Sequence, residues 1–424
     1  MTRAPIEMRL LPDTSAVESD GSLSIGGCRL DDLAGEFGTP LFVYDERHLR
    51  NRCREAVAEF GGGNVIYATK AFLCKAMARL AHEESLMLDV ATGGELYVAL
   101  AAGVPADRCV MHGNNKSDDE LRYAMREGVR HVVVDNFDEI DRIERIFATG
   151  GGRVRVQVRV TPGIHAHTHE YISTGQDDSK FGFNLANGDA LRAIERCRRS
   201  NATELVGVHF HIGSNVLDAD LLGRATTMMV EFFAPLGLPE ITVGGGLGVA
   251  YTAAEHAPTM GQWSAVVRSA ASGLPAGVEV MVEPGRSIVA AAAVTLYRVG
   301  SVKTIPGVRD YVAVDGGMSD NLRPMLYGAE YETFMPSHPT SLRNRAVRLV
   351  GKHCESGDVI IDEAHVPESL AVGDLLAVPV TGAYGYSMSS NYNMVTRPAV
   401  IFVADGRARI VRRRESYADL TMLD

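Results

Sequence analysis

The sequence predicts an α/β protein in which a (β/α)8 TIM-like barrel is followed by a separate C-terminal domain, a β-sandwich or β-barrel. Through the first two thirds of the chain, short runs of β-branched residues alternate with amphipathic helical stretches, which is the rhythm of βα units. Eight such runs precede Ser287. Beyond Ser287, short strand-like runs continue without regular helices between them. This change of pattern indicates a second architecture in the same chain.

The barrel strands are expected at short apolar runs that end in a turn or a polar segment. They lie at residues 65–69, 87–90, 109–112, 131–135, 154–160, 205–211, 241–243 and 278–283. Helices are expected between them, for example at 73–82, 94–102, 118–126 and 137–147, where apolar residues recur every three or four positions. Eight βα units of this length close into a barrel, which we expect to span residues 41–288.

The segments outside the barrel are mainly strand-like. Strands of the C-terminal β domain, residues 289–424, are expected at 294–299, 310–315, 358–361, 375–380 and 399–403. The N-terminal segment, residues 1–40, is rich in strand and turn signals, so we expect it to pack with this β domain. Residues 161–182 are rich in Gly, Thr and Ser, which predicts a long mobile loop, a candidate lid, after the fifth barrel strand.

The composition excludes several classes of protein. A formal net charge of -11 disfavours binding to the phosphate backbone of nucleic acids. The first residues lack the pattern of a signal peptide, and no apolar run reaches membrane-spanning length, so a cytoplasmic protein without a membrane partner is expected. Six cysteines without a CxxC pair argue against a zinc knuckle or a disulfide framework.

Polar residues gather where the barrel strands end, and this fold builds its active sites there. Lys70 ends the first strand. It is either a solvated charge or, if partly buried, an amine that loses its proton and condenses with an aldehyde. Glu283 ends the eighth strand, where it either caps a helix, pairs with Arg286, or keeps a pyridine nitrogen protonated. In the last case the ring accepts electrons from a breaking bond.

A run of three glycines, Gly244, Gly245 and Gly246, follows the seventh strand. It does not match GxGxxG, and a tight turn would explain it, but the loops after strands seven and eight commonly bind phosphate in this fold. Arg286 lies in the adjoining loop, and Ser214 follows the sixth strand at a position from which it would reach a phosphate. We therefore expect a phosphate-bearing cofactor.

Histidines occur in two patterns. His211 shares a strand face with His209 and is either a core residue or one that stacks on the ring of a cofactor. His165, His167 and His169 alternate in a predicted loop, without the helical spacing of HExxH. No metal site is expected from them.

Longer motifs complete the pattern. They are residues 89–96, 112–117 and 174–182 in the barrel region, and 315–321, 354–358, 382–384 and 390–393 in the C-terminal region. Together with Lys70 and the glycine run, they make the chain resemble, over nearly its whole length, the alanine-racemase-like barrel family of pyridoxal enzymes (fold type III), and within it the diaminopimelate decarboxylases. The resemblance implies decarboxylation of meso-2,6-diaminopimelate to L-lysine and CO2, the last step of lysine biosynthesis.

The resemblance also implies a cofactor, pyridoxal 5'-phosphate, and roles for individual residues. Lys70 would form the Schiff base, and Cys354 would protonate Cα after CO2 has left. The implied cofactor contacts are Lys70, Asp89, His211, Ser214, Gly244, Gly245, Gly246, Glu283, Gly285, Arg286 and Tyr384. The implied substrate contacts are Arg286, Arg323, Tyr327, Glu355 and Tyr384. The family further implies a homodimer in which the segment with Cys354 reaches the site of the opposite subunit.

Three alternatives stay open at this point. One is a fold-type-III decarboxylase that acts on ornithine, arginine, carboxynorspermidine or a carrier-bound amino acid. Arg286, Arg323 and Glu355 argue against simple diamines, because diaminopimelate presents a distal carboxylate as well as an ammonium group. The second is a racemase, which the Cys354 segment fits less well. The third is a catalytically silent regulatory homologue, which the presence of Lys70, Glu283 and Cys354 disfavours.

Overall fold

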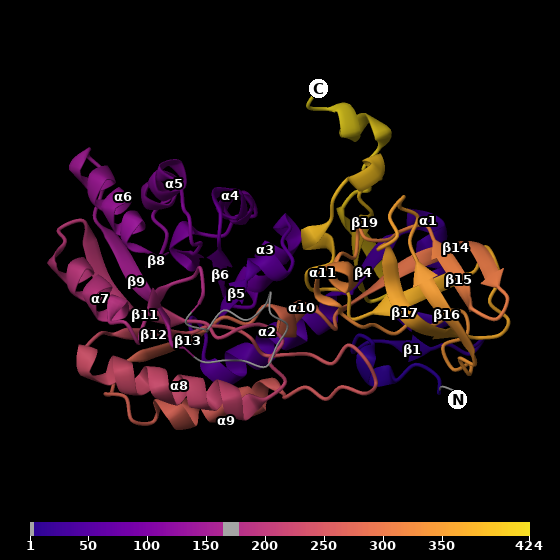
Figure 1. Cartoon of the computed structure of the whole chain (residues 1–424), viewed down its shortest axis with the longest axis horizontal. Coiled ribbons are helices and arrows are strands. Elements are labelled where there is room, and N and C mark those ends of the chain that lie inside the picture. Colours follow the sequence, from indigo (N-terminus) through magenta and orange to yellow (C-terminus); the bar gives the residue numbers. More distant parts are fainter. Residues whose placement is uncertain (1–3, 164–177) are drawn as a thin grey trace. The chain divides into compact units, whose positions relative to one another are not determined.

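The computed structural model describes residues 4–163 and 178–424 of the chain. They form two compact units that the chain enters more than once. The first, here called the β unit, comprises Met1–Arg52, Ala250–His256 and Ile288–Asp424. The second, the barrel unit, comprises Cys53–Val249 and Ala257–Ser287. Figure 1 shows the elements of both units.

The barrel unit is built on eight parallel strands, each hydrogen-bonded to its neighbours in sequence. The strands are β5 (Ile66–Ala68), β6 (Met87–Val90), β7 (Cys109–Met111), β8 (His131–Val134), β9 (Val154–Thr161), β11 (Thr203–Phe210), β12 (Glu240–Val243) and β13 (Glu279–Val282). A bridge between Val65 and Val282 joins the first strand to the last, so the sheet closes on itself. A short extra strand, β10 (Phe183–Asn184), extends β9. The predicted (β/α)8 barrel and its eight strands are confirmed.

Helices on the outside of the barrel follow the strands in turn (Figure 1). They are α3 (Lys75–Glu83), α4 (Gly93–Ala101), α5 (Asp118–Glu127), α6 (Phe137–Ala148), α7 (Asp189–Arg199), α8 (Ala219–Phe233) and α9 (Met260–Ala271). Local chemistry fixes where they begin and end. Helix α5 starts with a capping box between Ser117 and Glu120 and ends at Gly128 in the left-handed conformation. Helix α6 buries Ile140, Ile143 and Ile146 on one face.

The β unit contains one large sheet whose strand order is β17-β16-β15-β14-β4-β19-β20. Its strands are β4 (Leu41–Asp45), β14 (Ala293–Ile305), β15 (Arg309–Val314), β16 (Arg345–Val350), β17 (Val359–Val366), β19 (Ala399–Ala404) and β20 (Arg407–Arg412), while β18 (Leu375–Pro379) also pairs with β14. The long β14 organises the sheet. Its first part pairs with β4 and β18, and its second part with β15. Short helices complete the unit: α1 (Leu30–Phe37) and α11 (Arg323–Tyr327).

One boundary between the units differs from the predicted one. The barrel was expected to begin at residue 41, but the strand that starts there, β4, pairs antiparallel with β14 and parallel with β19, in the middle of the β unit. All of its residues, Leu41–Asp45, are buried. A strand buried on both faces has the same apolar composition in either sheet, so its sequence does not reveal its partners. The barrel unit accordingly begins at Cys53, after helix α2 (Glu46–Phe60) has started.

The N-terminal segment belongs to the β unit but forms its own small sheet. Strands β1 (Ala16–Val17), β2 (Leu23–Ile25) and β3 (Cys28–Arg29) pair only with one another among the described strands. Backbone hydrogen bonds join this sheet to the rest of the unit, from Leu23 N–H to Pro336 O (2.8 Å) and from Gly406 N–H to Gly26 O (2.7 Å). Within the described ranges, no helix has both the length and the apolar character needed to cross a bilayer.

A fully buried ion pair supports one side of the barrel. Lys116 Nζ lies 2.8 Å from Glu139 Oε1, and both side chains are completely inaccessible to solvent. The same ammonium group donates to Gly113 O (2.6 Å) and Val133 O (2.9 Å), so it joins the loop after β7 to the end of β8. Removing either partner would leave an uncompensated charge in the interior.

We therefore predict that Lys116→Met lowers the free energy of unfolding by about 3 kcal/mol or more. The fluorescence of Trp263 measures this in urea, since it is the only tryptophan of the chain and lies buried in α9 of the barrel unit. Lys75→Met, at an exposed position at the start of α3, is the control and should change stability by less than about 0.5 kcal/mol. Equal stability of both variants would contradict the prediction, and Lys116→Met combined with Glu139→Leu should recover much of the loss.

Candidate active site

The carboxyl end of β5 presents Lys70. The strand continues into a short 3-10 turn, Thr69–Ala71, and the Thr69 hydroxyl donates to Asp89 O at 2.6 Å, which fixes this turn against β6. Lys70 itself is exposed. Its charge acts on the pKa values of Asp89, Glu95 and His211. The lysine therefore lies among polar groups from several strand ends, and not on a remote surface.

Glu283 is the centre of a buried polar cluster. The residue follows β13 and is 5% exposed. Its Oε2 lies 2.8 Å from His209 Nε2, and its Oε1 lies 2.9 Å from His112 Nε2. Asp89, at the end of β6, is 3.8 Å from His112 Nε2. The two imidazole rings meet edge to face, with their centres 4.9 Å apart.

The contacts within this cluster shift the pKa values of its members in opposite directions. Burial alone would raise the pKa of Glu283, but His112 and His209 outweigh it and hold that pKa well below its ordinary value. Burial lowers the pKa of His209 to about 4, against the attraction of Glu283. Burial also opposes the charged form of His112, yet the carboxylates of Asp89 and Glu283 raise the pKa of His112. Glu283 is thus an ionised carboxylate at neutral pH.

The glycine run after β12 forms a close-fitting loop. A Cβ on Gly244 would lie 2.6 Å from both His211 Nδ1 and Phe210 O, and one on Gly245 would lie 2.1 Å from Glu283 O. Gly246 has φ +116, and a Cβ there would lie 2.7 Å from Gly213 O. Any side chain is therefore excluded, and the bare backbone is what an anion would approach. Beside this loop, Arg286 Nη2 donates to Ser214 Oγ at 3.0 Å.

Two further residues of the barrel unit, His211 and Gly285, were predicted to contact the cofactor. The pKa of His211 is well below its ordinary value, because burial and the charge of Lys70 both disfavour the imidazolium. A neutral ring suits stacking on another aromatic ring. At Gly285, a Cβ would lie 2.9 Å from the Ala68 side chain, so this glycine is required for the close packing of β13 on β5. Its predicted contact with a cofactor stays a prediction.

The barrel-unit residues fit pyridoxal phosphate as a group. The unit brings together an amine, an ionised buried carboxylate, a neutral imidazole and a side-chain-free loop flanked by a hydroxyl and a guanidinium. An aldehyde, a pyridine nitrogen, an aromatic ring and a phosphate would each find a chemical partner in this set. The predicted members present in this unit are Lys70, Asp89, His211, Ser214, Gly244, Gly245, Gly246, Glu283, Gly285 and Arg286.

The other predicted site residues belong to the β unit. Arg323 is buried at the start of α11, where its guanidinium donates to the Tyr331 hydroxyl and lies 4.2 Å from the ring centre of Tyr251. Burial disfavours its charge, but Tyr331 and Tyr251 raise its pKa above the ordinary value, so it stays cationic. Tyr327 ends the same helix. Tyr384 has φ 59, a left-handed backbone conformation that is uncommon for a residue with a side chain and concentrates at functional sites.

Cys354 and Glu355 lie in an exposed loop whose base is firmly anchored. The Asp358 carboxylate accepts hydrogen bonds from the N–H groups of Met318 (2.6 Å) and His353 (2.8 Å). The Cys354 N–H donates to Asn393 Oδ1 at 3.1 Å. Three motifs that are far apart in the sequence therefore meet at this loop. Cys354 is exposed, and all six cysteines are free thiols.

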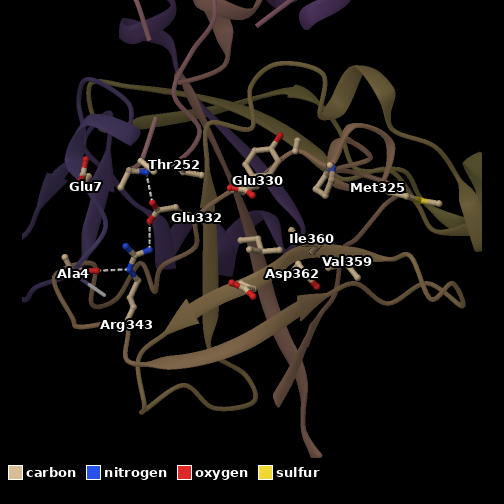
Figure 2. A pocket seen from close by; sticks show the side chains of 18 of the residues that line it. Ala4, Glu7, Thr252, Met325, Glu330, Glu332, Arg343, Val359, Ile360 and Asp362 are labelled. Atoms are coloured by element: carbon tan, nitrogen blue, oxygen red, sulfur yellow. Dashed lines mark hydrogen bonds and ion pairs between the residues drawn. The ribbon is translucent and has the colours of Figure 1, made fainter. Parts of the chain in front are cut away.

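The β unit also contains a cavity of about 840 Å³, shown in Figure 2. Glu332 accepts from Ala253 N–H at 2.7 Å and pairs with Arg343 at 2.7 Å, and Arg343 Nε donates to Ala4 O at 2.9 Å. Helix α11 contributes Met325 to the wall. Within the described part of the chain, the lining includes none of the residues predicted for the active site, so the cavity is no part of the candidate site.

Some expectations fall on residues outside the described ranges. The loop histidines His165, His167 and His169, most of the candidate lid and the start of the motif at 174–182 lie there. Elsewhere in the described chain, the donor atoms of His112, His209 and Glu283 lie within 4.8 Å of one another, a spacing at which a metal could bind. Both histidine Nε2 atoms already lie within 2.9 Å of the Glu283 carboxylate, so we interpret the set as a hydrogen-bonded polar cluster.

Sequence reasoning assigned no role to three residues of this region. His112 and Glu95 both lie within motifs of the resemblance, and a polar residue at a strand end was the available signal for His112. Arg159 acts on the charges of Asp89, His112 and Glu283. Its signal is the alternation in β9, Val154–Thr161, where polar side chains occupy every second position. Alternation of this kind in a barrel strand places a polar side chain toward the interior.

Comparison with known proteins agrees with this geometry. The family described as pyridoxal-dependent decarboxylase, pyridoxal binding domain, matches residues 46–290. The diaminopimelate decarboxylase of Mycobacterium tuberculosis is 46% identical to this chain and covers 97% of each sequence, and that of Bacillus subtilis is 45% identical over 98% of each.

Solved structures give the same result. The diaminopimelate decarboxylase from M. jannaschii superposes with a TM-score of 0.89 at 32% identity, covering 97% of this chain and 98% of that one. A lysine/ornithine decarboxylase from Vibrio vulnificus in complex with putrescine gives 0.76 at 25% identity, with 89% and 97% covered. The chain therefore belongs to the diaminopimelate decarboxylase family of pyridoxal-dependent decarboxylases.

Proposed function

We propose that this enzyme decarboxylates meso-2,6-diaminopimelate to L-lysine and CO2, the last step of lysine biosynthesis, with pyridoxal 5'-phosphate as cofactor. The observation that carries the proposal is the set of groups at the strand ends of the barrel unit, centred on Lys70 and Glu283. Relatives named diaminopimelate decarboxylase, at 46% identity over nearly the whole chain, support the choice of substrate.

The barrel unit holds the cofactor. Lys70 would supply the amine for the aldehyde, and the ionised carboxylate of Glu283 would pair with the ring nitrogen. Gly245 and Gly246 would bind the phosphate through backbone N–H groups, and Ser214 with Arg286 would add side-chain donors. Gly244 would line the same loop without a side chain, since its own N–H donates to Phe210 O at 2.8 Å. When bound, the cofactor supplies an electron sink for the pair of electrons released as the Cα–carboxylate bond breaks. Glu283 stabilises the protonated ring nitrogen that this requires.

The β unit supplies the groups that recognise the substrate. Arg323 is cationic and rigidly held by Tyr331 and Tyr251, which suits a carboxylate. Tyr327 and Tyr384 add hydroxyl groups, and Glu355 offers a carboxylate for an ammonium group. Cys354 gives its thiol proton to Cα after CO2 has left. A substrate with a distal carboxylate and a distal ammonium uses both kinds of partner, whereas ornithine would leave a guanidinium unpaired.

Two further features complete the proposal. The enzyme acts as a homodimer with shared sites, which the exposure of Cys354 and Glu355 supports, since the loop is open to contact with another surface. A cytoplasmic location follows from the function. A racemase would use Cys354 in a different way, and a silent homologue would make no use of Lys70.

The first test is product release. The holoenzyme should convert meso-diaminopimelate into equimolar lysine and CO2, with little conversion of ornithine or arginine. Lys70→Ala should lower turnover by on the order of a thousandfold or more, because the covalent attachment of the cofactor is lost. Lys75→Ala, at an exposed position of α3, is the matched control. Cofactor absorbance without lysine release would reject the substrate and keep the cofactor.

The second test concerns the phosphate loop. In Gly246→Ala the new Cβ would lie 2.7 Å from Gly213 O at a φ of +116, so the loop must move. We expect the affinity for pyridoxal phosphate, measured by fluorescence quenching, to weaken by about tenfold or more. Gly273→Ala is the control, because a Cβ there meets no atom within 4 Å. Unchanged affinity of Gly246→Ala would place the phosphate elsewhere.

The third test addresses subunit sharing. Lys70→Ala and Cys354→Ala chains are each expected to be nearly inactive. If sites are shared between subunits, unfolding and refolding the two together should restore activity, because some mixed dimers contain one intact site. Refolding either variant alone is the control. A mixture as inactive as its components would show that each chain completes its own site.

A further inference from the structure

His112 lies between two buried carboxylates in the barrel unit. Its Nε2 is 2.9 Å from Glu283 Oε1 and 3.8 Å from Asp89 Oδ1. All three residues are between 5% and 6% exposed. Ionising two acids this close to one imidazole in a low-dielectric site costs free energy. One of them therefore holds a proton more readily than the other.

The contacts of the two carboxylates favour ionisation of Glu283 over ionisation of Asp89. This carboxylate has an imidazole nitrogen at each oxygen, His112 at 2.9 Å and His209 at 2.8 Å. The Asp89 carboxylate makes the longer contact with the same imidazole, at 3.8 Å. The directions of the two pKa values agree with this: burial raises that of Asp89, whereas the two histidines lower that of Glu283 against burial.

His112 is held firmly in this place. Its backbone N–H donates to Val90 O at 2.8 Å, and its ring meets the ring of His209 edge to face. The next residue, Gly113, has φ +114 and gives its carbonyl to the buried ammonium of Lys116 at 2.6 Å. A Cβ on Gly113 would lie 2.8 Å from Ala91 O. These contacts fix the backbone that carries the imidazole, and the ring of His209 packs against it.

We propose that His112 is a positioning residue for the decarboxylase: it keeps Glu283 as the ionised acid of the pair and leaves Asp89 as the acid that holds a proton. The inference rests on the proposed function in one respect, since the ionised Glu283 is the group that meets the ring nitrogen of the cofactor. His209 differs from His112 in kind, because it is a neutral hydrogen-bond donor to the same carboxylate.

The charges around His112 come from five elements of the barrel unit. They are Asp89 at β6, His131 on β8, Arg159 on β9, His209 on β11 and Glu283 after β13. Arg159 disfavours the imidazolium, whereas both carboxylates favour it. His131 has a pKa well below its ordinary value because it is buried, so it adds no positive charge at neutral pH.

Infrared difference spectra of the apoenzyme at neutral pH test the inference directly. The wild type minus Glu283→Gln should show the band of an ionised carboxylate. His112→Gln minus His112→Gln/Glu283→Gln should show the band of a protonated acid instead. Buried acids elsewhere, among them Asp320 and Glu139, contribute equally to each member of a pair and cancel. The protonation of Asp89 depends on the charge of Glu283 and does not cancel, so each pair is also recorded with Asp89→Asn in both members. His209→Gln, treated in the same way, is the matched control and should keep Glu283 ionised. An ionised Glu283 band in the His112→Gln pair would overturn the proposal.

Two further measurements distinguish positioning from a structural role. By linkage, the pKa of His112 in the apoenzyme, followed by NMR, should fall by about one or more in Glu283→Gln. This measurement needs no variant of His112, so it remains decisive if His112→Gln does not fold; an unchanged pKa would refute the inference. In addition, His112→Gln should weaken cofactor binding about tenfold in the wild type and less than about twofold in Glu283→Gln.

The outcomes separate this inference from the proposed function. A wild-type protein that binds no pyridoxal phosphate and releases no lysine would reject the function, while the infrared and NMR results on the apoenzyme would still decide the role of His112. Equal losses of cofactor affinity in both backgrounds would mean that His112 does not act through Glu283, and would overturn the inference while the function stands.

Discussion

The ionised carboxylate of Glu283 in the barrel interior is the constraint on which the polar architecture of the barrel unit depends. A charge at this depth is stable only with partners at hydrogen-bond distance, and His112 and His209 supply them from two other strands. Because the three residues come from β7, β11 and the end of β13, the contact also fixes how these strand ends stand relative to one another. The loop after β7 also carries the buried ammonium of Lys116, and the loop after the neighbouring β12 carries the glycine run. The residues of the candidate site therefore also hold the strand ends of the barrel together.

Much of this arrangement was predictable from the sequence, and the reason is geometric. Parallel strands in a closed barrel deliver their carboxyl ends to one rim, so residues that follow successive strands become neighbours whatever their separation in the chain. Lys70, His211, Glu283 and the glycines could be recognised in this way before any coordinates were known. His112 also follows a strand, but its partner was not predictable, because the direction of a side chain at a strand end depends on the last turn of backbone. Arg159 required the inside and the outside of β9 to be distinguished.

The β unit was less predictable for a different reason. Strand β4 is buried along its whole length and mostly apolar, like a barrel strand, and only its pairing with β14 and β19 reveals where it belongs. The anchoring of the Cys354 loop likewise depends on long-range contacts: Asp358 binds the backbone of Met318, and Asn393 binds that of Cys354. The motifs in the sequence identified these segments as important. Their contacts with one another could not be predicted, because they depend on the order of the strands in the sheet. The outcome is an exposed thiol on a rigid base, which combines access with precise placement.

The division of the chain between the two units has a consequence for biosynthesis. Strand β4 leaves the ribosome early, but its two sheet partners, β14 and β19, follow only after the whole barrel has been made. During that interval a mostly apolar strand lacks both neighbours and can pair with other chains. Pairing between such distant segments is also slow to form. The β unit can thus complete its sheet only at the end of translation, so recombinant yield of this protein should depend on how well the nascent N-terminal strand is protected, and truncation near residue 290 would remove both partners of β4.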